Sequence, residues 1–356
     1  MKEELFFELI QVGLGRRERL SREPSMQEWS DLYVVSKKQA VVGVAFLALE
    51  KLNEEGLKPS SAILYEWIGQ SELIKQQNIF LNKKCIELMR MFADASFESC
   101  ILKGQGNALM YPEPLLRSSG DIDIWVDGKR DVIVKFCRAK ADGCEIVHHH
   151  IQFPICDNVK VEVHFIPSYS IVPRYERRMQ AYFEPFRCIE IEGRDLLPKD
   201  SKIYIPPKEM NLVFQMSHIA RHFFYGGVGL RQLIDYYYLL KSDGLWDKDE
   251  VIGILRNLGL YKFAGAVMWV LKEAFAAEDD LLIVPYDEKR GELLMSEIMK
   301  GGNFGQYDQR LSRRLRKRST TLSIITKNIR MMRLFPEEAI WAPIMGVWNE
   351  LKYKET

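Results

Sequence analysis

Two short stretches decide the fold of this chain: Lys103-Gly104-Gln105-Gly106 and Arg117-Ser118-Ser119-Gly120-Asp121-Ile122-Asp123-Ile124-Trp125-Val126. The first predicts a glycine turn, and the end of the second predicts a short strand with alternating carboxylates and apolar residues. Side chains of a strand alternate between its faces, so Asp121 and Asp123 share one face. Two such carboxylates raise each other's pKa unless a cation lies between them. Hard oxygen ligands of this kind favour Mg²⁺ or Mn²⁺ over Zn²⁺.

A third carboxylate is expected on a neighbouring strand. The segment Val159-Lys160-Val161-Glu162-Val163-His164-Phe165 alternates with period two, which places Glu162 and His164 on its polar face. Glu162 could therefore join Asp121 and Asp123 at one site. The alternative is that the Asp-x-Asp pair simply ends a solvated strand, as such pairs often do.

Together, these features resemble the nucleotidyltransferase superfamily that includes DNA polymerase beta and the aminoglycoside nucleotidyltransferases. The sequence is most similar to a little-characterised bacterial branch, and the residues that carry the resemblance are Lys103-Gly104, Tyr111-Pro112-Glu113-Pro114, Arg117, Asp121 to Val126, and Glu162-x-His164. These motifs cover roughly residues 100–165, and the helical part that follows also looks similar.

The resemblance implies a metal-dependent enzyme that transfers a nucleoside monophosphate from a nucleoside triphosphate to a hydroxyl of an unknown acceptor, a small molecule or a macromolecule. Asp121, Asp123 and Glu162 would be catalytic and would hold Mg²⁺ or Mn²⁺. One ion would lower the pKa of the attacking oxygen, and the other would stabilise the leaving pyrophosphate. The nucleotide-binding residues would be Lys103, Gly104, Gln105, Gly106, Arg117, His164, His218, His222 and Arg231.

The glycine turn departs from the superfamily pattern. Gln105 follows Gly104, where the superfamily usually has serine or glycine, and the turn lies farther from the carboxylates. The missing serine hydroxyl weakens the expected phosphate cradle, although Gly106 and backbone N–H groups could still face phosphates. The second functional hypothesis is therefore a catalytically inactive nucleotide- or protein-binding module with the same fold.

Two basic residues are candidates to neutralise the triphosphate, a third could face the pocket, and each has a simpler alternative. Lys103 and Arg117 could face the phosphates, or they could be a solvated lysine and an arginine paired with a carboxylate. Arg231 lies one helical turn before Asp235, so these two could face the pocket or pair with each other.

The six histidines fall in two areas of the chain. His148, His149 and His150 are consecutive. In a strand, His148 and His150 would share one face and His149 would lie on the other, which is poor geometry for three ligands to one metal ion. His218 and His222 are spaced i, i+4 on a predicted helix, but the glutamate of the zinc-protease motif is missing. The resemblance makes them and Arg221 candidates to line the nucleotide or acceptor pocket, and interface histidines are the alternative.

The pattern along the chain predicts an α+β fold, in which helical segments flank a small mixed β-sheet. We expect an N-terminal helical region over 1–98, a nucleotidyltransferase-like core over 99–206 and a C-terminal helical region over 207–356. Ser25-Met26-Gln27-Glu28 predicts a capping box that opens a helix to about Leu52. Further helices are expected over 61–95, 130–141, 208–223, 230–242, 248–257, 261–277, 289–299, 309–333 and 336–352. Strands are expected over 99–102, 121–126, 145–153, 159–165 and 188–191, with a hairpin turn at Asp157-Asn158.

Composition and the N-terminal sequence predict a folded cytoplasmic protein with no membrane partner. Lys and Arg number 50 against 49 Asp and Glu, so overall charge does not favour nucleic acid. The acidic N-terminus is unlike a secretory signal, and no apolar run is long enough to span a bilayer. The segment Arg310–Arg318 carries six basic residues in nine, which could contact nucleic acid, although a solvated helix is favoured.

Overall fold

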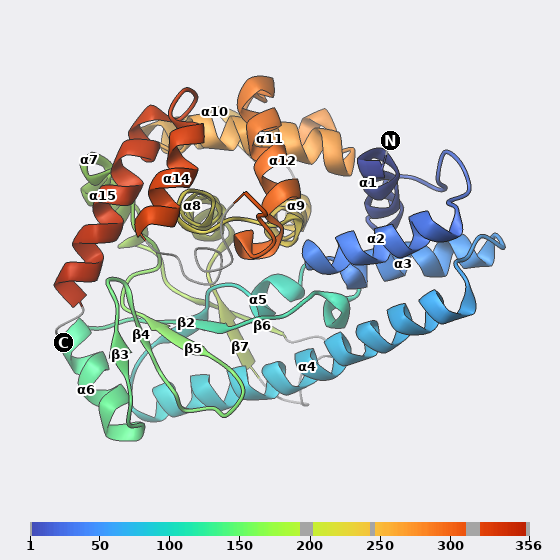
Figure 1. Cartoon of the computed structure of the whole chain (residues 1–356). Coiled ribbons are helices and arrows are strands. Elements are labelled where there is room, and N and C mark those ends of the chain that lie inside the picture. Colours follow the sequence, from blue (N-terminus) through green and yellow to red (C-terminus); the bar gives the residue numbers. More distant parts are fainter. Residues whose placement is uncertain (1, 193–201, 243–245, 311–320, 354–356) are drawn as a thin grey trace.

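The computed structural model describes residues 2–192, 202–242, 246–310 and 321–353. A five-stranded sheet lies between two layers of helices (Figure 1). The long helix α4 (Ser61–Asp94) runs along one face, and α8 (Lys208–Tyr225) lies on the opposite side (Figure 1). This arrangement confirms the predicted α+β class, a small mixed sheet flanked by N-terminal and C-terminal helices.

The five-stranded sheet has the order β1-β2-β5-β4-β3. Its strands are β1 (Ser99–Ile101), β2 (Ile122–Val126), β3 (Glu145–Ile146), β4 (His150–Gln152) and β5 (Val161–His164). The central pair, β2 and β5, is parallel and the other pairs are antiparallel. A second, two-stranded sheet pairs β6 (Ile189–Glu192) with β7 (Lys202–Ile205).

The sheet has one apolar face and one polar face, as the period-two patterns predicted. The apolar side chains of β2, β4 and β5 pack against α4 and α6 (Arg130–Lys140) in one hydrophobic cluster. Its most buried members are Leu81, Cys85, Phe92, Ile124, Val126, Ile133, Cys137, Ile151 and Val163. Because this face is filled by hydrocarbon, the carboxylates and histidines of the same strands must point to the other side.

The N-terminal helices are α1 (Lys2–Gly13), α2 (Met26–Lys38), α3 (Val42–Glu54) and α4. The capping box of Ser25 and Glu28 is present. The single helix predicted from there to Leu52 is wrong, because the chain breaks at Ala40, whose φ is +55°. The Gln39 side chain donates to the carbonyl of Ile298 and accepts from the N–H of Leu230, so distant contacts fix this break.

The C-terminal helices after α8 are α9 (Leu230–Ser242), α10 (Lys248–Asn257), α11 (Tyr261–Phe275), α12 (Glu288–Gly301), α14 (Thr321–Met331) and α15 (Pro336–Tyr353). Short 3₁₀ turns lie at η1 (Pro114–Leu116), η3 (Asp279–Leu281) and η4 (Asn303–Gly305). The N-terminal and C-terminal helices share one large hydrophobic core. The division of the chain at residues 98 and 206 stays a prediction.

Several local predictions need correction or lie outside the described residues. The strand predicted over 145–153 is two short strands joined by a turn, and helix α7 (Pro173–Phe183) was not predicted. The turn at Asp157-Asn158 is confirmed, and Asn158 has a φ of +65°. Most of the basic segment, residues 311–318, lies outside the described residues, while Arg310 pairs with Glu297 and Asp308. None of the helices described has both the length and the apolar character needed to cross a membrane.

Candidate functional site

The polar face of the sheet brings carboxylates from two strands together. Asp123 of β2 and Glu162 of β5 are direct partners in the parallel register, and Gln152 of β4 is the next partner of Glu162. The prediction that Glu162 lies on a strand beside Asp123 is therefore confirmed. Asp121 lies just before β2.

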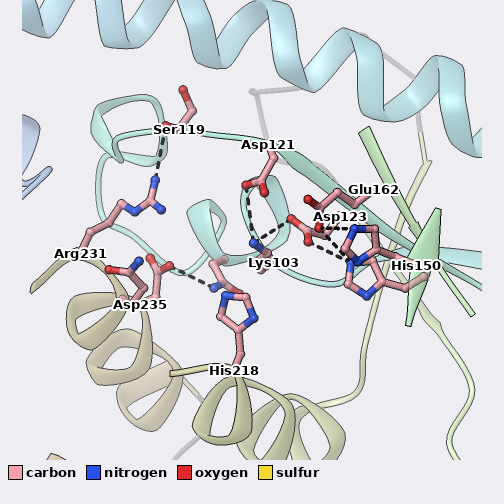
Figure 2. Close-up of polar contacts among 12 residues, drawn as sticks. Lys103, Ser119, Asp121, Asp123, His150, Glu162, His218, Arg231 and Asp235 are labelled. Carbon is pink, nitrogen blue, oxygen red and sulfur yellow. Dashed lines mark hydrogen bonds and ion pairs between the residues drawn. The ribbon is translucent and has the colours of Figure 1, made fainter. Parts of the chain in front are cut away.

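Lys103 lies between the two aspartates (Figure 2). Its Nζ is 2.9 Å from Asp123 Oδ2 and 3.5 Å from Asp121 Oδ1. Burial opposes the charged form of Lys103, but attraction to both carboxylates outweighs it and raises the lysine pKa. Burial likewise opposes the ionised form of both carboxylates, and the charge of Asp121 adds to this effect at Asp123. The attraction of Lys103, together with other charges and hydrogen bonds, outweighs these effects and lowers the pKa of both carboxylates. The lysine thus occupies the position that the sequence assigns to a cation.

Glu162 has a different environment from the two aspartates. Its Oε1 accepts a hydrogen bond from Gln152 Nε2 at 2.8 Å, and its Oε2 lies 3.6 Å from His150 Nε2. Burial and the nearby Asp123 charge raise the pKa of Glu162. His164 Nε2 lies 3.0 Å from Asp123 Oδ1, so His164 orients that carboxylate. Of the three carboxylates, Glu162 is the best suited to accept a proton.

A cavity of about 250 Å³ opens over this face. It is lined by Lys103, Asp121, Asp123, His149, His150, Glu162, His164, Tyr169, His218, Arg221, His222 and Tyr225. Helix α8 supplies the wall opposite the sheet, and His218 points from it toward Lys103 (Figure 2). Burial lowers the pKa values of His218 and His222 well below the ordinary histidine value. Burial also lowers the pKa of His150, to about 3. These imidazoles are therefore neutral at neutral pH.

The donor atoms at the site fit a divalent cation. Within the described residues, two groups of three side chains have ligand atoms within 4.8 Å of one another: Asp123, Glu162 and His164, and also His149, His150 and His164. The oxygen-rich first group suits Mg²⁺ or Mn²⁺. Asp121 belongs to neither group because its carboxylate faces Lys103. A cation shared by Asp121 and Asp123 would have to displace the Lys103 ammonium.

The glycine turn is built differently from a phosphate cradle. Gly104 has a φ of +63° and precedes the short helix α5 (Gln105–Ala108). Gln105 is buried and donates to Asn82 Oδ1 at 2.5 Å, on the side of α4. A Cβ on Gly106 would lie 3.1 Å from the carbonyl oxygen of Ile101. Neither Gln105 nor Gly106 lines the cavity, so the structure places them away from the carboxylates.

Arg117 forms a buried ion pair instead of facing the cavity. Its Nε and NH2 atoms each lie 2.7 Å from an oxygen of Asp235, and Tyr111 and Asn107 donate to the same carboxylate. Of the two alternatives that the sequence left open for Arg117, the structure shows the arginine paired with a carboxylate. The alternative pairing of Arg231 with Asp235 is absent, because Arg231 NH1 donates to the carbonyls of Ser118 and Ser119. Both arginines brace the loop that leads to Asp121.

Sequence reasoning missed two residues that line the cavity, Tyr169 and Tyr225. It also missed Gln152, which donates to Glu162, although the His150-x-Gln152 pattern was a usable signal because it places both residues on one strand face. In a strand, His149 was expected to lie on the face opposite His148 and His150. It lies in the turn before β4, which lets it line the cavity together with His150.

Comparison with known proteins identifies one family. The sequence profile of a family described as "Uncharacterised nucleotidyltransferase" matches residues 25–276, well over half of the chain. No curated protein and no solved structure matches this chain.

Proposed function

The chain belongs to the family of uncharacterised nucleotidyltransferases, and we propose that it transfers a nucleoside monophosphate from a nucleoside triphosphate to a hydroxyl group of an acceptor, with Mg²⁺ or Mn²⁺. The observation that carries the proposal is the row of carboxylates on neighbouring strands, Asp123 beside Glu162, with Asp121 one residue before β2. A cation held by these three residues would neutralise charge on the triphosphate.

The side chains of the cavity have distinct roles in the proposed reaction. The acceptor oxygen forms a bond to the α-phosphorus, the bond from that phosphorus to the bridging oxygen breaks, and pyrophosphate leaves. Glu162, whose pKa is raised, takes the proton of the acceptor hydroxyl. Lys103, displaced from between the aspartates, contacts phosphate oxygens. His164 keeps Asp123 oriented throughout.

The first experiment measures binding. ATP, GTP, CTP and UTP are titrated calorimetrically into the wild type, Asp123→Asn and Asp127→Asn, with Mg²⁺ and with EDTA. Asp127 is an exposed aspartate directly after β2, so it controls for a general loss of negative charge. We expect Mg²⁺-dependent binding of a nucleotide that Asp123→Asn weakens at least tenfold and Asp127→Asn leaves unchanged. Equal binding by both variants would contradict the assignment of Asp123.

The alternative, an inactive nucleotide-binding module, is supported by one observation: Lys103 fills the space between Asp121 and Asp123. A second experiment separates it from the enzyme. The bound nucleotide, labelled at its α-phosphate, is incubated with the protein and a cell extract. Transfer of label that Glu162→Gln abolishes, while nucleotide binding persists, supports the enzyme. Binding without any transfer of label supports the module.

A further inference from the structure

Arg221 of α8 is a buried cation in the wall opposite the carboxylates. Its exposed fraction is 7%, and its guanidinium lies 4.5 Å from the ring centre of Tyr169. NH1 lies 3.1 Å from His149 Nε2, and NH2 lies 3.3 Å from His218 Nδ1. Burial lowers the pKa of both histidines well below its ordinary value, so Arg221 is surrounded by neutral groups.

No carboxylate among the described residues compensates this charge at ion-pair distance. On the same side of the cavity, Arg221 influences the pKa of one acidic side chain, Glu176. The carboxylate oxygens of Glu176 already accept hydrogen bonds from the Ser170 N–H at 2.6 Å and from Gln180 Nε2 at 2.9 Å. Arg221 Nε is buried and has no hydrogen-bond partner. Arg117, by contrast, is also buried but has a bidentate carboxylate partner.

A buried guanidinium without a counter-ion is unfavourable, because the hydration that it loses on burial is not replaced by a paired negative charge. A ligand that brings an anion into the cavity would remove this penalty. The planar fork of arginine matches two oxygens of a phosphate group, and the Nε–H of Arg221 donates to no protein group in the described part of the chain.

We propose that Arg221 binds a phosphate group of the ligand, across the cavity from Asp121, Asp123 and Glu162. The identity of that ligand rests on the proposed function, whereas the anion site itself does not. The phosphate has two candidate sources, the triphosphate of the donor nucleotide and a phosphate carried by the acceptor. Tyr169 and His218 hold the guanidinium in place, so Arg221 acts as a preformed contact.

The test uses inorganic pyrophosphate in EDTA, so that it needs no metal site and no turnover. Calorimetric titrations compare the wild type, Arg221→Gln, Arg221→Lys, and Arg177→Gln, a control on the exposed surface of α7. We expect pyrophosphate affinity to fall at least tenfold in Arg221→Gln, less in Arg221→Lys, and not at all in Arg177→Gln. Asp123→Asn should keep or strengthen this binding, because it removes a negative charge from the cavity.

Wild-type protein that binds no pyrophosphate would overturn the proposal, as would Arg221→Gln protein that binds it like the wild type. Thermal melting with and without pyrophosphate checks that each variant is folded and gives an independent measure of binding. Titration of nucleotide with Mg²⁺ then identifies the source. A parallel loss in Arg221→Gln assigns the phosphate to the donor, and unchanged nucleotide binding assigns it to the acceptor. If no variant binds nucleotide but pyrophosphate binding persists, the proposed function fails and the anion site stands.

Discussion

Asp235 is the residue on which the loop before the carboxylates depends. Its carboxylate accepts from Arg117, Tyr111 and Asn107, all of which belong to a segment more than a hundred positions earlier in the chain. The attraction of Arg117 outweighs burial and lowers the pKa of Asp235, so the pair is ionised. A charge pair buried this deeply is expensive to break from one side.

We predict that Asp235→Asn lowers the free energy of unfolding by about 3 kcal/mol, because it leaves the Arg117 guanidinium buried without its counter-charge. Urea unfolding of both proteins measures the loss. The control is Glu337→Gln, which breaks the exposed pair of Arg174 and Glu337 and should cost far less, because water and salt screen that pair. Similar losses in the two variants would show that the buried network contributes little.

Individual residues were predictable from sequence only where a local pattern fixed them. The alternation along two strands placed Asp123 and Glu162 on facing positions, because strand geometry leaves a side chain only two directions. Nothing local indicated that Asp235 would take Arg117 rather than Arg231, one turn away on its own helix. That choice depends on how α9 packs against a distant loop.

At the scale of elements, the turn between β1 and α5 carries the backbone strain of the site. Gly104 has φ +63° and ψ −107°, a conformation that residues with a Cβ rarely adopt. A Cβ there would meet only the carbonyl oxygen of Asp121, at 3.5 Å, an ordinary contact. The requirement for glycine is therefore conformational, and it falls directly after Lys103.

We predict that Gly104→Ala lowers the free energy of unfolding by about 1–3 kcal/mol through this backbone strain. The matched control is Gly69→Ala, an exposed position within α4 where an added Cβ would meet nothing within 4 Å. That change should instead stabilise the protein by about 0.5–1 kcal/mol, because alanine favours a helix. Urea denaturation of the two variants measures both effects, and a stable Gly104→Ala protein would show that the turn can relax.

Elements with strong local signals were predicted well. The capping box started α2, and the helices predicted over 61–95 and 130–141 are α4 and α6. The break at Ala40 was not predicted, because Gln39 fixes it through contacts with Ile298 and Leu230. The turn before β4 was likewise hidden within a run of residues that suited one longer strand.

At the scale of the whole molecule, the sheet has its two faces covered by different parts of the chain. Residues before the sheet supply α4 on the apolar face, and residues after it supply α8 over the polar face (Figure 1). Sequence predicted the sheet and both helical regions, and the family resemblance made His218, Arg221 and His222 of α8 candidates to line a pocket, as they do here. The closure collects all six histidines of the chain around one region, five of them lining the cavity and His148 against the ring of Tyr169.

This clustering predicts a protein that is sensitive to acid. Burial, with the nearby charge of Arg221, lowers the pKa of His148 from an ordinary 6.5 to about 4, and the pKa values of His149, His150, His218 and His222 are lowered as well. In the unfolded chain each histidine takes up a proton near pH 6.5, whereas the folded protein does not until the pH is much lower. The stability of the fold is therefore complete above pH 6.5 and falls as the pH drops from 6.5 toward 4, by up to about 1.4 kcal/mol per pH unit for each histidine.

We expect urea unfolding at pH 7.5, 6.0 and 5.0 to show a steep loss of stability over the two lower values. His148→Gln is the informative variant because His148 lies at the edge of the cluster, against the ring of Tyr169. It should reduce the loss between pH 6.0 and 5.0 by about 1 kcal/mol, since glutamine takes up no proton in either state. Between pH 7.5 and 8.5 the wild type and the variant should show the same small pH dependence. If the variant loses as much stability as the wild type between pH 6.0 and 5.0, then His148 is protonated in the folded protein, and the cavity wall must admit water there.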